Sequence, residues 1–161
     1  MKVVVAIDDS PQSQHMLDLI VRREWANDTE FKVVHVVEPL NASDWSGDGW
    51  MEMQHDVLRR RHKGAEKLCS DARHKLESHI PTSIVHYEVR EGNPKAEIVY
   101  AATQWDANKV IIGAHSREVC PHNSLGSVSR SVAEQSSCTV EIIRIGAAAK
   151  APRKEKAKSA K

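Results

Sequence analysis

The chain has 161 residues, of which 28% are charged and 40% hydrophobic, and its formal net charge is +1. This length is enough for one domain with a sizeable core. The mean hydropathy of −0.49 and the lack of any apolar run near the roughly 20 residues that span a bilayer exclude an integral membrane protein. The apolar run after Met1 and Lys2 is too short for a secretory signal, so we expect a cytoplasmic protein.

Five short runs rich in β-branched residues predict strands. They are KVVVAI from Lys2, FKVVHVV from Phe31, SIVHYEV from Ser83, KVIIGA from Lys109 and TVEIIRI from Thr139. Segments with helical spacing lie between them, and we expect each to form one helix.

Helix start signals agree with this division. Ser10 and Asn93 are each followed by proline, the pattern of an N-cap residue before a first helical turn. The longest helix is predicted over residues 51–78, and the last begins after Gly126 and Ser127. Strands and helices then alternate strictly, which predicts an α/β fold: a doubly wound, five-stranded parallel sheet of order 3-2-1-4-5 with helices on both faces.

Polar residues follow the two strands that are central in this order. Asp8, Asp9 and Ser10 follow the first strand, and Gly113 ends the fourth. Ligands of doubly wound sheets bind at the carboxyl ends of the strands where the order reverses, between strands one and four. Gly126 would place a helix N-terminus there as well, and free backbone N–H groups at such a terminus bind anions.

Four stretches resemble the universal stress protein family: VVVAIDDSPQS, VVHVVEP, EGNPKAEIV, and IIGAHS followed nine residues later by GSVS. The nucleotide-binding branch of that family is marked by Gly, two residues, Gly, nine residues, Gly and then Ser or Thr. Here the pattern is Gly113, Ser116 in place of the second glycine, Gly126 and Ser127.

The resemblance implies a homodimeric protein that binds ATP. Asp8 and the backbone near Val36 would contact the nucleoside end, and Ala6 is a further nucleotide-binding residue. The phosphates would lie against Gly113, Ser116, Gly126, Ser127 and Val128. Asp8 is the candidate for holding Mg²⁺ together with the phosphates. If Ser116 occupies a position that needs glycine, the cost is roughly 1–2 kcal/mol, or about tenfold in affinity.

Two functions stay open at this point. One is an ATP-binding regulatory module that senses or signals; the chain lacks the phosphate-loop motif with lysine, so we expect no fast hydrolysis and at most a slow ATPase. The other is a stress-response scaffold that binds no nucleotide in this loop and acts through dimerisation and contacts with protein partners.

Two further expectations concern the edges of the fold. The fifth strand lies at a sheet edge, and two copies pairing there would cover it, so we expect the homodimer to use this strand. Residues 1–146 are predicted to form the single domain and residues 147–161 a disordered basic tail. Residues 150–161 carry six Lys/Arg and one Glu, whereas the preceding residues carry 17 basic and 21 acidic side chains. Nucleic acid is therefore an unlikely partner except through weak contacts of this tail.

Overall fold

The computed structural model describes residues 1–40, 50–114 and 125–144. It contains a sheet of five parallel strands in the order β3-β2-β1-β4-β5. This confirms the predicted α/β fold and its strand order. The predicted tail lies outside the described residues.

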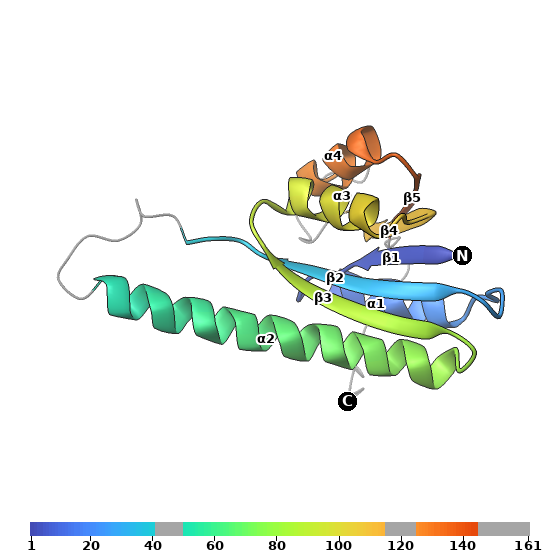
Figure 1. Cartoon of the computed structure of the whole chain (residues 1–161), viewed down its shortest axis with the longest axis horizontal. Coiled ribbons are helices and arrows are strands. Elements are labelled where there is room, and N and C mark those ends of the chain that lie inside the picture. The colour runs from blue at the N-terminus through green and yellow to red at the C-terminus, as the bar shows by residue number, and fades with distance from the viewer. Residues whose placement is uncertain (41–49, 115–124, 145–161) are drawn as a thin grey trace, which may run out of the picture.

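Strands and helices alternate along the chain (Figure 1). The strands are β1 (Lys2–Ala6), β2 (Glu30–Val37), β3 (Ile84–Glu91), β4 (Lys109–Gly113) and β5 (Thr139–Ile143). The helices are α1 (Pro11–Val21), α2 (Trp50–His79), α3 (Pro94–Gln104) and α4 (Ser127–Gln135). Figure 1 shows α1 and α2 on one face of the sheet and α3 and α4 on the other. None of the helices within the described ranges combines the length and the apolar character that a membrane crossing requires.

The central strand β1 is buried on both faces because its side chains alternate between two cores. Val3 and Val5 belong to the core beneath α1 and α2, with Met16, Leu17, Phe31 and Leu76. Val4 and Ala6 belong to the core beneath α3 and α4, with Val34, Ile98, Val110 and Val132. This explains why the sequence of β1 is continuously apolar rather than alternating.

Helix starts follow the predicted capping residues. Ser10 is the N-cap of α1, and its side chain accepts a hydrogen bond from the Ser13 amide. Asn93 caps α3 in the same way, through a bond from the Lys95 amide at 3.0 Å. Proline occupies the next position in both helices, where its missing N–H costs nothing. These two caps fix where the chain turns from strand to helix at the carboxyl edge of the sheet.

Candidate functional site

A cleft of about 470 Å³ lies at the carboxyl ends of β1, β2 and β4, bounded by the first turns of α1, α3 and α4. Seven of the predicted site residues line it: Ala6, Asp8, Val36, Gly113, Gly126, Ser127 and Val128. The eighth, Ser116, lies outside the described residues. The structure therefore brings together residues from three distant parts of the sequence at the point where the strand order reverses.

Asp8 is held at the N-terminus of α1. Its Oδ1 atom accepts hydrogen bonds from the Ser13 hydroxyl at 2.6 Å and from the Ser10 amide at 3.2 Å, and it also contacts the Ser10 hydroxyl. The Ser13 hydroxyl in turn accepts from the Asp8 amide at 2.9 Å. These bonds converge on one carboxylate oxygen, so they fix the direction in which the other oxygen is presented.

The backbone of Val36 faces the cleft from β2. Even-numbered residues of β2 bond toward β1: the Glu30 amide donates to Met1, and the Val34 carbonyl accepts from Ile7 at 2.9 Å. Val36 is the next such residue, and it lies beyond the last β1–β2 pair, Ala6 and Val34. An amide and a carbonyl in this position form an adjacent donor and acceptor on the cleft wall.

His35 contributes to this arrangement from the neighbouring position. Its Nδ1 atom lies 2.9 Å from the Ile7 carbonyl. Because a carbonyl only accepts, Nδ1 carries the proton in this contact. If β1 continued past Ala6, the Ile7 carbonyl would accept a hydrogen bond from the Val36 amide. Here it accepts one from the His35 imidazole instead. His35 therefore has a structural hydrogen bond and also lines the cleft.

The opposite wall is the N-terminus of α4. Gly126 is the N-cap residue and supplies no side-chain cap. The Gly126 amide donates to the Ala114 carbonyl at 2.8 Å. The Ser129 hydroxyl donates to the same carbonyl at 2.9 Å and lies 3.1 Å from the Gly126 carbonyl. The first turn of α4 is thus fastened to the end of β4. Ser127 and Val128 line the cleft, and amides at the start of a helix have no intrahelical acceptor.

Gly126 does not need the conformational freedom of glycine. Its φ of −62° and ψ of 159° are open to any residue. What glycine provides here is the absence of a side chain beside amides that the helix itself leaves without intrahelical acceptors. This distinguishes Gly126 from a glycine required by a left-handed turn.

The described part of the cleft lining contains the carboxylates of Asp8, Asp9 and Glu38 and no lysine or arginine. The described residues also include no group of three or more His, Cys, Asp or Glu side chains that is able to hold a metal ion. A bound anion would therefore depend on backbone amides and the helix dipole, and a divalent cation would need ligands from the anion as well.

Several cleft residues were not predicted from the sequence. Ser13 holds Asp8, and Ser129 fastens α4, although both resemble ordinary helix residues in the sequence. Gln12 lines the cleft, and its Oε1 atom is buried without a hydrogen-bond partner among the described residues. Pro94 and Ile98 of α3 also line the cleft. All of these residues lie within the stretches that resemble the family, but only Pro94 carried a signal of its own, through the Asn-Pro start of its helix.

Fold and cleft together define a doubly wound α/β protein with its ligand position outside the carboxyl ends of the strands. The family model described as the universal stress protein family matches residues 1–144, and the chain belongs to that family.

Several relatives are similar over most of their length. Universal stress protein YxiE of Bacillus subtilis (strain 168) is 26% identical over 148 residues, which cover 89% of this chain and 98% of that protein. A universal stress protein of Arabidopsis thaliana, At3g01520, solved with AMP bound, matches with a TM-score of 0.64 and 14% identity over 92% of this chain and 94% of the other. The universal stress protein of Archaeoglobus fulgidus in complex with dAMP matches with a TM-score of 0.55 and 23% identity, over 89% and 97%.

Proposed function

We propose that this chain binds ATP in the cleft and acts as a cytoplasmic regulatory module that responds to the nucleotide. The observation that carries the proposal is the pair of opposed walls: an uncapped helix N-terminus at Gly126 and a fixed carboxylate at Asp8, in one cleft. Two structurally similar members of the family contain adenine nucleotides, AMP in one and dAMP in the other.

The two walls suit the two ends of a nucleotide. The amide and carbonyl of Val36 offer a donor and an acceptor to the edge of a base, and Asp8 accepts hydrogen bonds from ribose hydroxyls. The small side chain of Ala6 leaves room between them. Gly113, Gly126, Ser127 and Val128 would surround the phosphates, with Ser116 contributing from the intervening segment.

Acidic residues in the cleft favour Mg²⁺ as part of this complex. Phosphates beside Asp8 and Asp9 would be repelled unless a cation lies between them, since two like charges at about 4 Å cost about 4 kcal/mol at an effective dielectric constant of 20. We propose that ATP binds as its magnesium complex, with Asp8 as the protein ligand. Without a cationic side chain in the described lining, no group of that kind stabilises the charge of phosphoryl transfer, so we expect slow hydrolysis at most.

Isothermal titration calorimetry with ATP, AMP and adenosine, with and without Mg²⁺, tests the proposal. Gly126→Asp is the informative variant because aspartate is a good N-cap residue at these backbone angles, so the fold should persist. Its carboxylate would cap the same amides and repel phosphate. We expect ATP affinity to fall on the order of a hundredfold or more while adenosine affinity stays within about threefold.

Gly64→Asp provides the matched control, since Gly64 is exposed on α2 with no atom near the added Cβ. It introduces the same charge away from the cleft and should leave both affinities unchanged. Wild-type protein that binds no ATP at millimolar concentration would contradict the proposed function. Equal loss of ATP and adenosine in Gly126→Asp would instead place the phosphates elsewhere.

We also propose that the protein is a homodimer paired through β5. This strand forms one edge of the sheet. Val140 and Ile142 are only partly buried, whereas their partners in β4, Val110 and Ile112, are buried. Pairing of two β5 strands would satisfy the backbone groups of both edges.

A further inference from the structure

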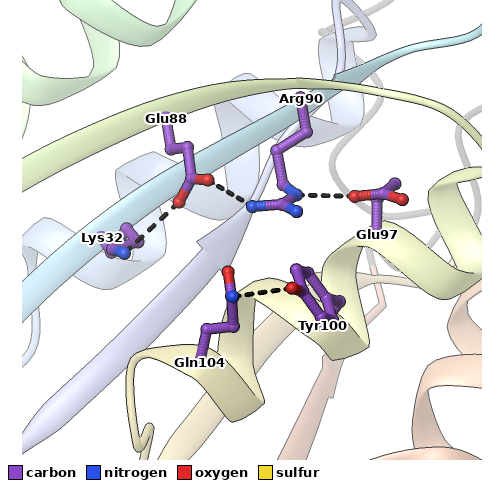
Figure 2. Close-up of polar contacts among 6 residues, drawn as sticks. All are labelled: Lys32, Glu88, Arg90, Glu97, Tyr100 and Gln104. Atoms are coloured by element: carbon purple, nitrogen blue, oxygen red, sulfur yellow. Dashed lines mark hydrogen bonds and ion pairs between the residues drawn. The ribbon is translucent and has the colours of Figure 1, made fainter.

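Arg90 is the centre of a polar cluster between β3 and α3 (Figure 2). Its Nε atom donates to Glu97 at 2.7 Å, and its Nη1 atom contacts Glu88. Glu88 also accepts from Lys32 at 3.3 Å. The cluster therefore links side chains from β2 and β3 to the first turn of α3 through one guanidinium group.

The guanidinium of Arg90 is shielded from water. The Arg90 side chain is only 15% exposed, compared with 33% for Glu88 and 26% for Glu97. Burial by itself disfavours the charged form, but the hydrogen bonds that Arg90 donates to Glu97 and Glu88 outweigh it and raise the pKa of Arg90. Tyr100 covers the group with its ring centre 4.9 Å away, and Gln104 donates to the Tyr100 hydroxyl at 2.7 Å.

Arg90 is also beside the nucleoside end of the cleft. It pairs directly with Val36 in the β2–β3 register. Only two residues, Gly92 and Asn93, connect β3 to α3, and the Gly92 amide donates to the Val37 carbonyl at 3.1 Å. The first turn of α3 carries both Glu97, which Arg90 holds, and Pro94, which lines the cleft.

Ile98 follows Glu97 and faces the other way. It lines the cleft and packs in the core beneath α3 and α4. A shift of the α3 first turn relative to β3 would therefore move Pro94 and Ile98 against the Val36 backbone. The width of the cleft at its nucleoside end therefore depends on the separation between the first turn of α3 and the backbone at Val36.

We propose that Arg90 is a positioning residue for nucleoside binding: by bridging Glu88 on the sheet and Glu97 on α3, it fixes the wall formed by Pro94 and Ile98 opposite Val36. This inference rests on the proposed function and adds a determinant of base affinity that does not itself touch the ligand. Lysine cannot replace arginine here, because one ammonium group lacks the planar fork that binds two carboxylates in fixed directions.

Titration of adenosine and ATP into Arg90→Lys, Glu97→Gln and Glu97→Ala tests the inference, with a thermal melt of each sample. We expect Arg90→Lys and Glu97→Ala to weaken adenosine and ATP by the same factor, about three- to tenfold, on the scale where 1.4 kcal/mol is tenfold. Glu97→Gln keeps an oxygen acceptor for Arg90 Nε and should retain the adenosine affinity even if its melting temperature falls. A purely structural role would instead move affinity and melting temperature together.

Arg73→Lys is the matched control. Arg73 Nε donates to Glu77 at 2.7 Å within α2, a contact of the same kind and length that does not border the cleft. It should leave both affinities unchanged. If Arg90→Lys does not fold, the adenosine affinity of Glu97→Ala decides.

The inference is overturned if Arg90→Lys and Glu97→Ala bind adenosine within twofold of wild type, or if these two variants bind ATP more weakly but adenosine as well as wild type does. The second result would indicate a long-range charge effect. Wild-type protein that binds neither ligand would refute the proposed function itself, and the inference with it.

Discussion

Replacement of Gly92 by alanine tests the backbone of the β3–α3 connection. Gly92 has a φ of +139°, a value that side chains with a Cβ rarely adopt. An added Cβ would lie 3.0 Å from Cγ and 3.2 Å from Oε1 of Glu97. The substitution therefore strains the backbone and also displaces the carboxylate that Arg90 holds.

The expected loss of stability follows from these two effects. A residue other than glycine in a sparsely populated backbone region costs about 1–3 kcal/mol. Alanine reduces the entropy of the unfolded chain, which offsets about 0.4–1 kcal/mol. Displacement of Glu97 weakens a charged hydrogen bond and adds to the loss. We expect the free energy of unfolding to fall by about 1–3 kcal/mol, and the melting temperature by about 3–10 °C for a chain of this size.

Urea denaturation followed by circular dichroism measures the change, and Gly64→Ala is the control of opposite sign. Gly64 lies inside α2, and an added Cβ there meets no atom within 4 Å. Alanine at that helical position should stabilise the protein by about 0.5–1 kcal/mol. The reasoning is refuted if the free energy of unfolding of Gly92→Ala lies within 0.5 kcal/mol of the wild-type value, or if Gly64→Ala is less stable than Gly92→Ala.

Two further predictions concern the β4–β5 side of the sheet. Burial by itself raises the pKa of Glu141, but hydrogen bonds from Arg23 and Lys109 outweigh it, so the pKa lies below the ordinary 4.5. The ionised carboxylate therefore stabilises the fold above pH 4.5, and this contribution is lost as the pH falls further. In thermal melts over a series of acidic pH values, the melting temperature of Glu141→Gln should depend less steeply on pH than that of the wild type. An unchanged slope would contradict the assignment. In sedimentation velocity at micromolar concentration we expect a dimer for the wild type and a monomer for Val140→Lys, which places a charge at a partly buried position of the edge strand β5. A monomeric wild type would exclude the proposed pairing.

The sequence was sufficient to predict the sheet and the place of the cleft. β-branched runs alternated with helical segments, and that alternation allows few topologies. Asp8 and Gly113 were expected to lie near each other because the carboxyl ends of parallel strands meet at one edge. Helix starts at Ser10 and Asn93 were predictable for a local reason, since N-cap chemistry involves only residues two or three positions apart.

Contacts between residues far apart in the sequence were not predictable, because they depend on how the strands and helices align in space. The bond between His35 and Ile7 joins β2 to the residue that follows β1, and it requires β1 to end where it does. The bridge from Arg90 to Glu97 and Glu88 requires the short turn at Gly92, and in the sequence these charges resemble any solvated surface. Likewise, a glycine at position 126 does not reveal whether it serves the backbone or leaves space for a ligand.

The double hydrogen bond at the Ala114 carbonyl has an evolutionary consequence. The Gly126 amide and the Ser129 hydroxyl both reach that one oxygen, so β4 and α4 are joined directly where the intervening segment leaves and returns. The free-energy cost of joining two fixed ends by a loop rises by only about 0.6 kcal/mol for each doubling of the loop's length. The place of α4 against the end of β4 is therefore set by these two bonds and depends little on how many residues join Ala114 to Gly126. Selection can then change the length of the connection between these two residues at little cost to the stability of the domain.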